Sequence, residues 1–140
     1  MPTIFTRIID GEFPGRFVWR DDECVAFLSI NPLQPGHTLV VPRAEVDHWI
    51  DLPVELNAHL MRVAHVIGTA QMIAFTPNRV GLIIAGLEVP HVHLHVVPIR
   101  READLSFANA ELSPAPEALD DAAQRLRAAL SDADASGVSE

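Results

Sequence analysis

Three histidines alternate with three apolar residues in one short segment: His91, Val92, His93, Leu94, His95 and Val96. Successive side chains of a β-strand point to opposite faces of a sheet, so this period of two predicts a strand over residues 91–97. The valines and the leucine would face the core, and the three imidazoles would share the other face, about 6.5–7 Å apart along the strand. Pro90 and Pro98 would bracket this strand. Such a row can present several nitrogen atoms to one ligand.

The spacing of apolar residues predicts helices and hairpin-linked strands in the rest of the chain. We expect helices over residues 3–9, 53–75 and 117–130. We expect further strands over residues 16–20, 24–28, 37–41 and 80–85. This mixture is typical of an α+β domain, and 140 residues suit a single domain.

The composition excludes several classes of protein. All ten basic residues are arginines, so the chain has no lysine for a Schiff base or a phosphate-binding P-loop. The formal net charge is −9, and most of it falls in residues 102–140, which hold nine acidic residues and two arginines. No basic stripe indicates nucleic-acid binding, and no apolar run is long enough to span a membrane. The single cysteine, Cys24, cannot form an internal disulfide, which favours a reducing cytoplasm.

Three interpretations of the histidines compete. In the first, the imidazoles only coat a solvated strand. In the second, they bind a metal ion, with a third ligand from His37, His48 or Glu88. In the third, one imidazole attacks phosphorus and the others bind the phosphate. We favour the third, because an imidazole with an ordinary pKa of about 6.5 can be a neutral nucleophile or a cationic phosphate partner near neutral pH.

At these residues the sequence resembles a known family. After Pro90, residues 91–97 follow the pattern His-φ-His-φ-His-φ-φ, in which φ is apolar. The stretch from Pro32 to Arg43 is similar to the pattern Pro-x-x-x-Gly-His-x-Leu-φ-φ-Pro-Lys and contains His37. Together these motifs resemble the histidine triad (HIT) superfamily, and the likeness covers roughly residues 3–100.

The resemblance implies a five-stranded antiparallel sheet with two main helices, continued across a homodimer. It also implies that His93 attacks the α-phosphorus of a purine nucleotide conjugate and that water then releases the nucleoside monophosphate. His95 would contact the phosphate and the leaving group, His91 would orient the nucleophile, and His37 would support the triad. Nucleoside phosphoramidates are the expected substrates, with dinucleoside polyphosphates, or binding without turnover, as the alternatives. No metal ion or other cofactor is expected.

The resemblance also assigns a set of nucleotide-binding residues: Phe5, Ile8, Phe27, Ser29, Ile30, Leu87 and Glu88. The apolar members would line a base pocket or, equally, belong to the core. Ser29 replaces an acid that holds the ribose in relatives, and Leu87 replaces a glutamine at the phosphate. The segment 83–90 is also shorter than in relatives. Glu88 would repel an anionic substrate if it pointed inward, and we favour a surface position for it.

Two further departures concern the ends of the chain. Thr3 and Thr6 stand where many relatives have the Cys-x-x-Cys of a structural zinc site, and Glu45 stands near the downstream zinc histidine, so no structural zinc is expected. Beyond a catalytic core of residues 1–101, we expect an extension over residues 102–130 whose helix packs on the core. We expect a disordered tail over residues 131–140. The extension would set specificity or cover the sheet.

Overall fold

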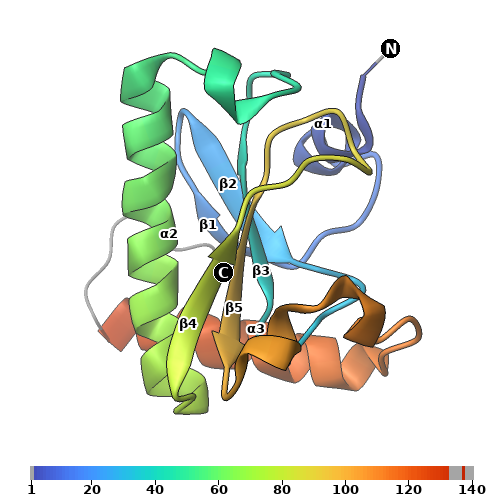
Figure 1. Cartoon of the computed structure of the whole chain (residues 1–140), viewed down its shortest axis with the longest axis vertical. Helices are drawn as coiled ribbons and strands as arrows, with labels where there is room; N and C mark the ends of the chain where they lie inside the picture. The colour runs from blue at the N-terminus through green and yellow to red at the C-terminus, as the bar shows by residue number, and fades with distance from the viewer. Residues whose placement is uncertain (1, 133–136, 138–140) are drawn as a thin grey trace.

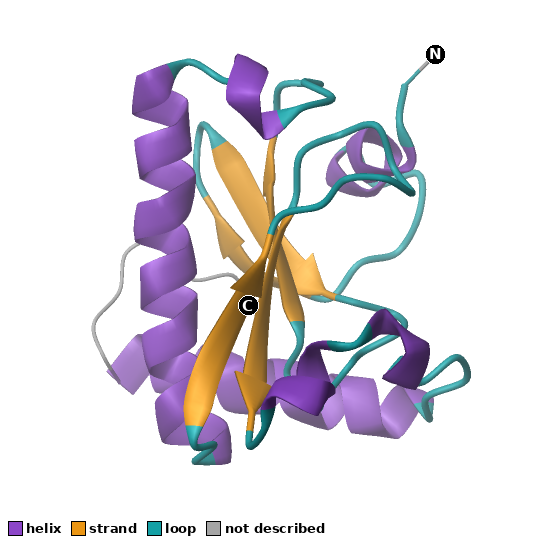
Figure 2. Cartoon of the chain, viewed as in Figure 1, coloured by secondary structure: helices purple, strands orange, loops and turns teal. Residues whose placement is uncertain are grey.

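A computed structural model describes residues 2–132 and residue 137 (Figure 1). Within these residues the α-helices are α1 (Ile4–Ile9), α2 (Val54–Phe75) and α3 (Pro116–Asp132). The strands are β1 (Phe17–Arg20), β2 (Cys24–Leu28), β3 (Thr38–Pro42), β4 (Arg79–Ile83) and β5 (Leu94–Ile99). They form one antiparallel sheet in the order β1-β2-β3-β5-β4 (Figure 2). The expected α+β fold, with a five-stranded antiparallel sheet and two main helices, is confirmed.

The main core lies between the sheet and the two long helices α2 and α3 (Figures 1 and 2). Leu60 and Ile67 of α2 and Leu126 of α3 are fully buried there. They pack with Val40 of β3 and Val96 of β5 in one apolar cluster. Each such buried aliphatic side chain contributes about 1.5–3 kcal/mol, so this layer holds the helices against the sheet.

The opposite face of the sheet is covered by α1. The ring centroids of Phe5 and Phe27 lie 5.7 Å apart, and those of Phe27 and Phe17 are also 5.7 Å apart. Leu39 belongs to the same cluster and pairs with His95 across the β3–β5 ladder. Residues of two strands that pair directly point to the same face, so His95 lies on the α1 face, outside the main core.

The strand that carries the histidines begins later than the sequence pattern predicts. β5 starts at Leu94, so two of the three histidines lie in the segment that leads into it. If the β3–β5 register continued, Pro42 would stand opposite Val92, and a proline has no N–H to donate to a ladder. The N–H of Val92 instead donates to the carbonyl oxygen of Val46 over 2.8 Å. The expected strand over residues 91–97 is therefore wrong at its start.

The end of the same strand also differs. The sequence pattern places Pro98 beyond the strand, but β5 runs through Pro98 to Ile99. The proline is tolerated because the pairing of β5 with β3 ends at Val96, so Pro98 has no β3 partner that requires its N–H. β4 ends at Ile83, two residues before the expected end, and β2 has the expected bounds.

After β5 the chain forms two short 3-10 helices (Glu102–Leu105 and Phe107–Asn109) and then α3, which packs on α2. α3 extends through Asp132, two residues into the segment expected to be a disordered tail. Residues 133–136 and 138–140 of that segment lie outside the described residues. Across the described part of the chain, every helix is too short or too polar to cross a membrane.

Candidate active site

One ring nitrogen of His93 is held by the backbone. Its Nδ1 atom lies 2.7 Å from the carbonyl oxygen of His91. A carbonyl oxygen only accepts hydrogen bonds, so the neutral imidazole carries its proton on Nδ1 and has a lone pair on Nε2. This tautomer is the one that a nucleophilic Nε2 requires.

His95 is held in the opposite tautomer by a chain of two hydrogen bonds. The backbone N–H of Leu33 donates to Nδ1 of His37 over 3.0 Å, so a neutral His37 carries its proton on Nε2. That Nε2 donates to Nδ1 of His95 over 2.9 Å. A neutral His95 therefore carries its own proton on Nε2, where it can donate to a ligand.

The two imidazoles are neighbours. The ring centroids of His93 and His95 lie 4.8 Å apart, with the ring planes at 65°. Among the described residues neither Nε2 atom has a hydrogen-bond partner, and neither is a buried unpaired atom, so both reach solvent. The pair can offer one lone pair and one N–H donor to the same ligand. An electrophilic phosphorus with negatively charged oxygens matches this combination.

Both ring nitrogens of His91 are engaged. Nε2 donates to the carbonyl oxygen of Pro42 over 2.7 Å, and Nδ1 accepts from the hydroxyl of Thr3 over 2.7 Å. Thr3 is also the N-cap of α1, and its hydroxyl accepts the N–H of Thr6. Glu45 accepts from the backbone N–H of Thr3 and from the hydroxyl of Thr6. His91 is fully buried, and its two hydrogen bonds tie α1 to the end of β3.

These residues occupy the positions that the HIT resemblance connects with a structural zinc. The donor set does not suit zinc, because the two hydroxyls of Thr3 and Thr6 stand in place of two thiolates. Both nitrogens of His91 are also committed to hydrogen bonds. In this chain the segment around His91 is held by the hydroxyls and by Glu45.

Burial determines the charge of the four histidines. Desolvation, with smaller effects from neighbouring imidazoles, lowers the pKa of His37 to about 3 and that of His95 to about 4, from an ordinary 6.5. Desolvation also lowers the pKa values of His91 and His93, although hydrogen bonds to backbone carbonyls act in the opposite direction. All four imidazoles are therefore neutral at pH 7, which preserves the two tautomers and leaves Nε2 of His93 unprotonated.

Gly36 and Gln71 set the position of His37. Gly36 has a φ of +91°, and a Cβ atom there would overlap the ring of Phe75, so the position requires glycine. The buried amide of Gln71 donates to the carbonyl oxygens of Gly36, over 2.9 Å, and Val96, over 2.8 Å. Through this amide, α2 locks the turn before His37 onto β5.

The family model of the HIT domain matches residues 10–102, well over half of the chain. The chain belongs to the HIT family. It is 39% identical over 106 residues to an uncharacterized HIT-like protein of Methanocaldococcus jannaschii, and this match covers 72% of the present chain and 81% of that protein. It is 30% identical over 128 residues to an adenylylsulfatase of Arabidopsis thaliana, and this match covers 88% of the present chain and 64% of the plant protein.

A solved structure supports the same assignment. The fold is similar to that of a Zn-bound histidine triad family protein from Mycobacterium smegmatis, with a TM-score of 0.81 and 30% sequence identity. The likeness covers 94% of both chains, so it includes the C-terminal part that lies beyond the match to the HIT domain.

The HIT fold brings three of the expected nucleotide-binding residues together. Phe5, Ile8 and Phe27 lie in the apolar cluster on the α1 face. The ring of Phe5 also contacts His93, with 4.9 Å between centroids. Phe5 and Phe27 are buried and pack as core, and the ring of Phe5 also forms an apolar flank beside His93.

The other expected nucleotide-binding residues lie apart from this cluster. Ile30 and Leu87 are 66% and 96% exposed, and Glu88 is exposed. The hydroxyl of Ser29 accepts a backbone N–H from the turn that follows it. Within the described residues none of these side chains is hydrogen-bonded to a histidine of the triad. The charge of Glu88 nevertheless raises the pKa of His93, against the larger effect of burial.

Two groups that contact the histidines of this HIT site, the ring of Phe107 and the backbone N–H of Leu33, were given no role from the sequence. The ring of Phe107 contacts His95, with 5.1 Å between centroids, and 48% of the residue is exposed. Its signal in the sequence is that it is the one aromatic residue after residue 100. The N–H of Leu33, which sets the tautomer of His37, has no signal because it belongs to the backbone.

Proposed function

We propose that this HIT protein is a cytoplasmic nucleotide hydrolase or transferase that acts on nucleoside phosphoramidates or related nucleotide conjugates. The reaction would cleave the bond between the α-phosphorus and the leaving group through a nucleotidyl-histidine intermediate on His93. One observation carries this proposal. The unprotonated Nε2 of His93 lies beside the protonated Nε2 of His95, and both reach solvent. Membership of the HIT family supports the same chemistry.

The first half of the proposed reaction is a displacement at phosphorus. The lone pair on Nε2 of His93 forms a bond to the α-phosphorus as the bond to the leaving group breaks. The leaving group departs with that electron pair and takes a proton from solvent. Nε2–H of His95 donates a hydrogen bond to the departing atom or to a phosphoryl oxygen, which stabilises the developing negative charge.

The second half returns the enzyme to its starting state. The substituted imidazole of His93 is a cation that keeps its Nδ1 proton. Its Nδ1–H donates a hydrogen bond to the carbonyl oxygen of His91 over 2.7 Å. This contact stabilises the positive charge of the intermediate. Water then attacks phosphorus, the N–P bond breaks, and the electron pair returns to Nε2. The products are a nucleoside monophosphate and a proton released to solvent.

The substrate class follows from what the site would hold. The apolar flank at Phe5 suits a purine base beside the reacting phosphate. The name of the Arabidopsis relative, an adenylylsulfatase, describes a reaction of the same type, because adenylyl sulfate joins an α-phosphorus to an anionic leaving group. Phosphoramidates, adenylyl sulfate and dinucleoside polyphosphates are therefore the substrates to compare.

A second candidate is a nucleotide-binding protein on the same fold that turns nothing over. Two observations favour it. Ser29 stands at the position that a carboxylate would need for the ribose, and a neutral hydroxyl makes a weaker contact. Leu87 is 96% exposed and offers no polar group to a phosphate.

The deciding experiment measures nucleoside monophosphate release from adenosine and guanosine phosphoramidates, adenylyl sulfate and dinucleoside polyphosphates, with a chelator present. Wild type, His93→Ala and His48→Ala are run together, because His48 is an exposed histidine outside the site. Release by wild type and His48→Ala, with loss in His93→Ala, supports the enzyme. Mass spectrometry of the acid-sensitive nucleotidyl adduct would place the covalent bond. Tight nucleotide binding without release supports the binding protein, and full activity in His93→Ala contradicts the mechanism.

We also propose that the protein is a homodimer that continues the sheet. β4 is the last strand of the described sheet, so its outer edge can pair with a further strand. Beside this edge, a groove of about 460 Å³ between α2 and β4 is lined by Met61, Met72 and Leu82, which are 53%, 42% and 38% exposed. A twofold-related copy would cover these apolar side chains and pair β4 with β4. Light scattering should give twice the chain mass for wild type and a monomer for Met72→Glu; a monomeric wild type contradicts this proposal.

A further inference from the structure

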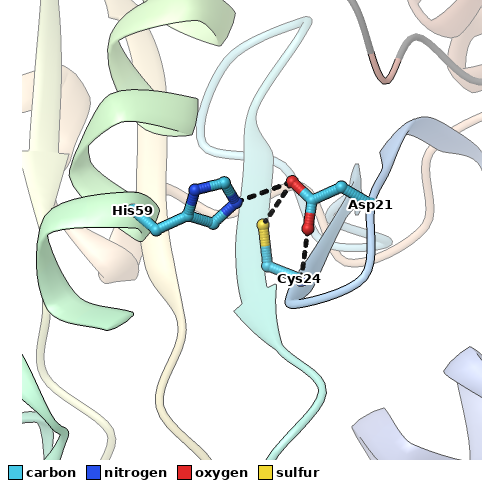
Figure 3. Close-up of side chains that lie close together, drawn as sticks. All are labelled: Asp21, Cys24 and His59. Atoms are coloured by element: carbon cyan, nitrogen blue, oxygen red, sulfur yellow. Dashed lines mark hydrogen bonds and ion pairs between the residues drawn. The ribbon is translucent and has the colours of Figure 1, made fainter. Parts of the chain in front are cut away.

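Three side chains of different chemistry converge between the β1–β2 hairpin and α2 (Figure 3). Asp21 lies in the turn after β1, Cys24 is the first residue of β2, and His59 lies on α2. Nε2 of His59 lies 2.7 Å from Oδ2 of Asp21, and Sγ of Cys24 lies 3.6 Å from the same oxygen. One ligand atom from each residue lies within 4.8 Å of the others.

We propose that Asp21, Cys24 and His59 bind a divalent metal ion of the zinc type. Thiolate, imidazole and carboxylate are the three ligand types that zinc takes in proteins. Zinc–ligand bonds of about 2.0–2.3 Å at tetrahedral angles separate neighbouring ligand atoms by about 3.3–3.6 Å. The sulfur–oxygen separation of 3.6 Å matches this spacing, and the nitrogen–oxygen separation of 2.7 Å needs only a small side-chain rotation.

The groups around the cluster are those that orient metal ligands. A histidine bound to metal through Nε2 must carry its proton on Nδ1, and that proton usually meets an acceptor. Oε2 of Glu23 lies 3.7 Å from Nδ1 of His59, in position to accept it after a small adjustment. The indole N–H of Trp19 donates to Oδ2 of Asp21 over 2.8 Å, and two backbone N–H groups hold Oδ1. The carboxylate is therefore oriented before any ion arrives.

Metal binding at this site would release protons from the ligand atoms that bind the ion. On binding, the thiol proton of Cys24 leaves to solvent, and the sulfur binds the ion. The proton that Nε2 of His59 donates to Asp21 is also released to solvent, and Nδ1 takes up a proton, so that Nε2 can bind the ion. The side chains of Asp21 and His59 are 23% and 22% exposed, which leaves a route for the ion and a fourth position for water.

The site is separate from the histidine triad. Cys24 belongs to the core between the sheet and α2, whereas His95 lies on the α1 face. The ion would join the β1–β2 hairpin to α2 and would add stability without entering the nucleotide chemistry. The inference therefore does not rest on the proposed function.

Cobalt(II) gives a test with one clear readout. A thiolate bound to cobalt produces a charge-transfer band in the near ultraviolet, and Cys24 is the chain's single cysteine, so the band reports this site alone. The reduced full chain is titrated with cobalt and then with zinc. The variants are Cys24→Ser, His59→Ala and Glu23→Gln, with His65→Ala as the control because it is an exposed histidine on the same helix.

We expect the band to appear at one cobalt per chain and to disappear when zinc displaces the cobalt. It should be absent in Cys24→Ser and His59→Ala and unchanged in His65→Ala. Glu23 is a surface residue, so Glu23→Gln will fold and should weaken binding about 10- to 100-fold. Zinc should also raise the melting temperature of wild type and not that of Cys24→Ser. A wild type without the band at millimolar cobalt, or a folded His59→Ala that keeps it at full strength, would overturn the proposal.

Discussion

Nε2 of His37 lies 2.9 Å from Nδ1 of His95, although the two residues are 58 positions apart in the chain. His37 cannot donate to a phosphate itself, because its other nitrogen accepts the N–H of Leu33. Its effect on the site is therefore indirect. It decides which nitrogen of His95 carries the proton that faces the ligand.

The first prediction follows from this contact. His37→Leu should lower kcat/KM about 10- to 100-fold, because losing the buried hydrogen bond that selects the tautomer of His95 costs about 1–3 kcal/mol. It should also lower the free energy of unfolding by about 1–3 kcal/mol, because the buried N–H of Leu33 loses its acceptor. Nucleoside monophosphate release and urea unfolding measure the two effects. His37→Gln keeps a donor and an acceptor and should recover part of the rate; an equal loss in both variants would show that only packing matters.

The second prediction concerns the pH dependence of stability. The pKa values of His37 and His95 are lowered to about 3 and about 4, whereas the unfolded chain titrates near 6.5. As pH falls below 6.5, these two histidines become protonated in the unfolded state and stay neutral in the folded state. The free energy of unfolding therefore falls. The loss is at most about 1.4 kcal/mol per pH unit for each histidine. It should continue toward pH 4 for His95 and pH 3 for His37.

Urea unfolding at pH 7, 6 and 5 tests this directly. Wild type and His48→Ala should lose stability with the same slope, and His37→Leu should lose it with a smaller slope. The acid limb of kcat/KM should lie below pH 6.5, because burial also lowers the pKa of His93 from its ordinary value. An acid limb of kcat/KM centred at 6.5 or above would contradict this account of the nucleophile.

The third prediction concerns the network that holds His91. Thr3→Val keeps the shape of the side chain and removes the hydroxyl that donates to Nδ1 of His91 over 2.7 Å. It also removes the N-cap of α1, so we expect a loss of about 1–2 kcal/mol in the free energy of unfolding. His91 keeps its bond to the carbonyl oxygen of Pro42, so kcat should fall less than tenfold. Thr3→Ser restores the hydroxyl and should restore both quantities; a Thr3→Val enzyme as inactive as His93→Ala would contradict the expectation that the contact with Pro42 is enough to hold His91.

The alternation of the histidine segment predicted its faces correctly and its strand boundary incorrectly. Val92, Leu94 and Val96 lie in the main core, as a period of two requires. The start of β5 depends on Pro42, a residue of the partner strand, and a pattern read along residues 91–97 does not contain that information. Local periodicity therefore predicts which way a side chain points more reliably than where a ladder stops.

The chemistry of the site depended on contacts between residues far apart in the sequence. The histidines could be named from their spacing, and the structure brings the rings of His93 and His95 together. Their tautomers depend on backbone groups, such as the N–H of Leu33, that every sequence has. The hydrogen bond between Thr3 and His91 spans 88 positions, so spacing could not reveal it.

The fourth prediction assigns a role to Phe107, which comes from the C-terminal extension. Its ring contacts His95, with 5.1 Å between centroids, and 48% of the residue is exposed. If Nε2–H of His95 faces the leaving group, the exposed side of this ring lies where an aromatic or large apolar leaving group would pack. Aromatic pairs contribute about 0.5–1.5 kcal/mol, so Phe107→Ala should lower kcat/KM about 2- to 12-fold for phosphoramidates with aromatic amines. The unsubstituted phosphoramidate should change little.

The measurement is the ratio of kcat/KM between the two phosphoramidates, in wild type and in the variant. Phe13→Ala is the matched control, because Phe13 is 41% exposed and packs with Arg7 on the surface. It should leave the ratio unchanged. An equal loss on both substrates in Phe107→Ala would show that the ring acts by orienting His95 instead of contacting the leaving group. A selective loss on the aromatic substrate would show that the extension beyond the HIT core chooses what the enzyme releases.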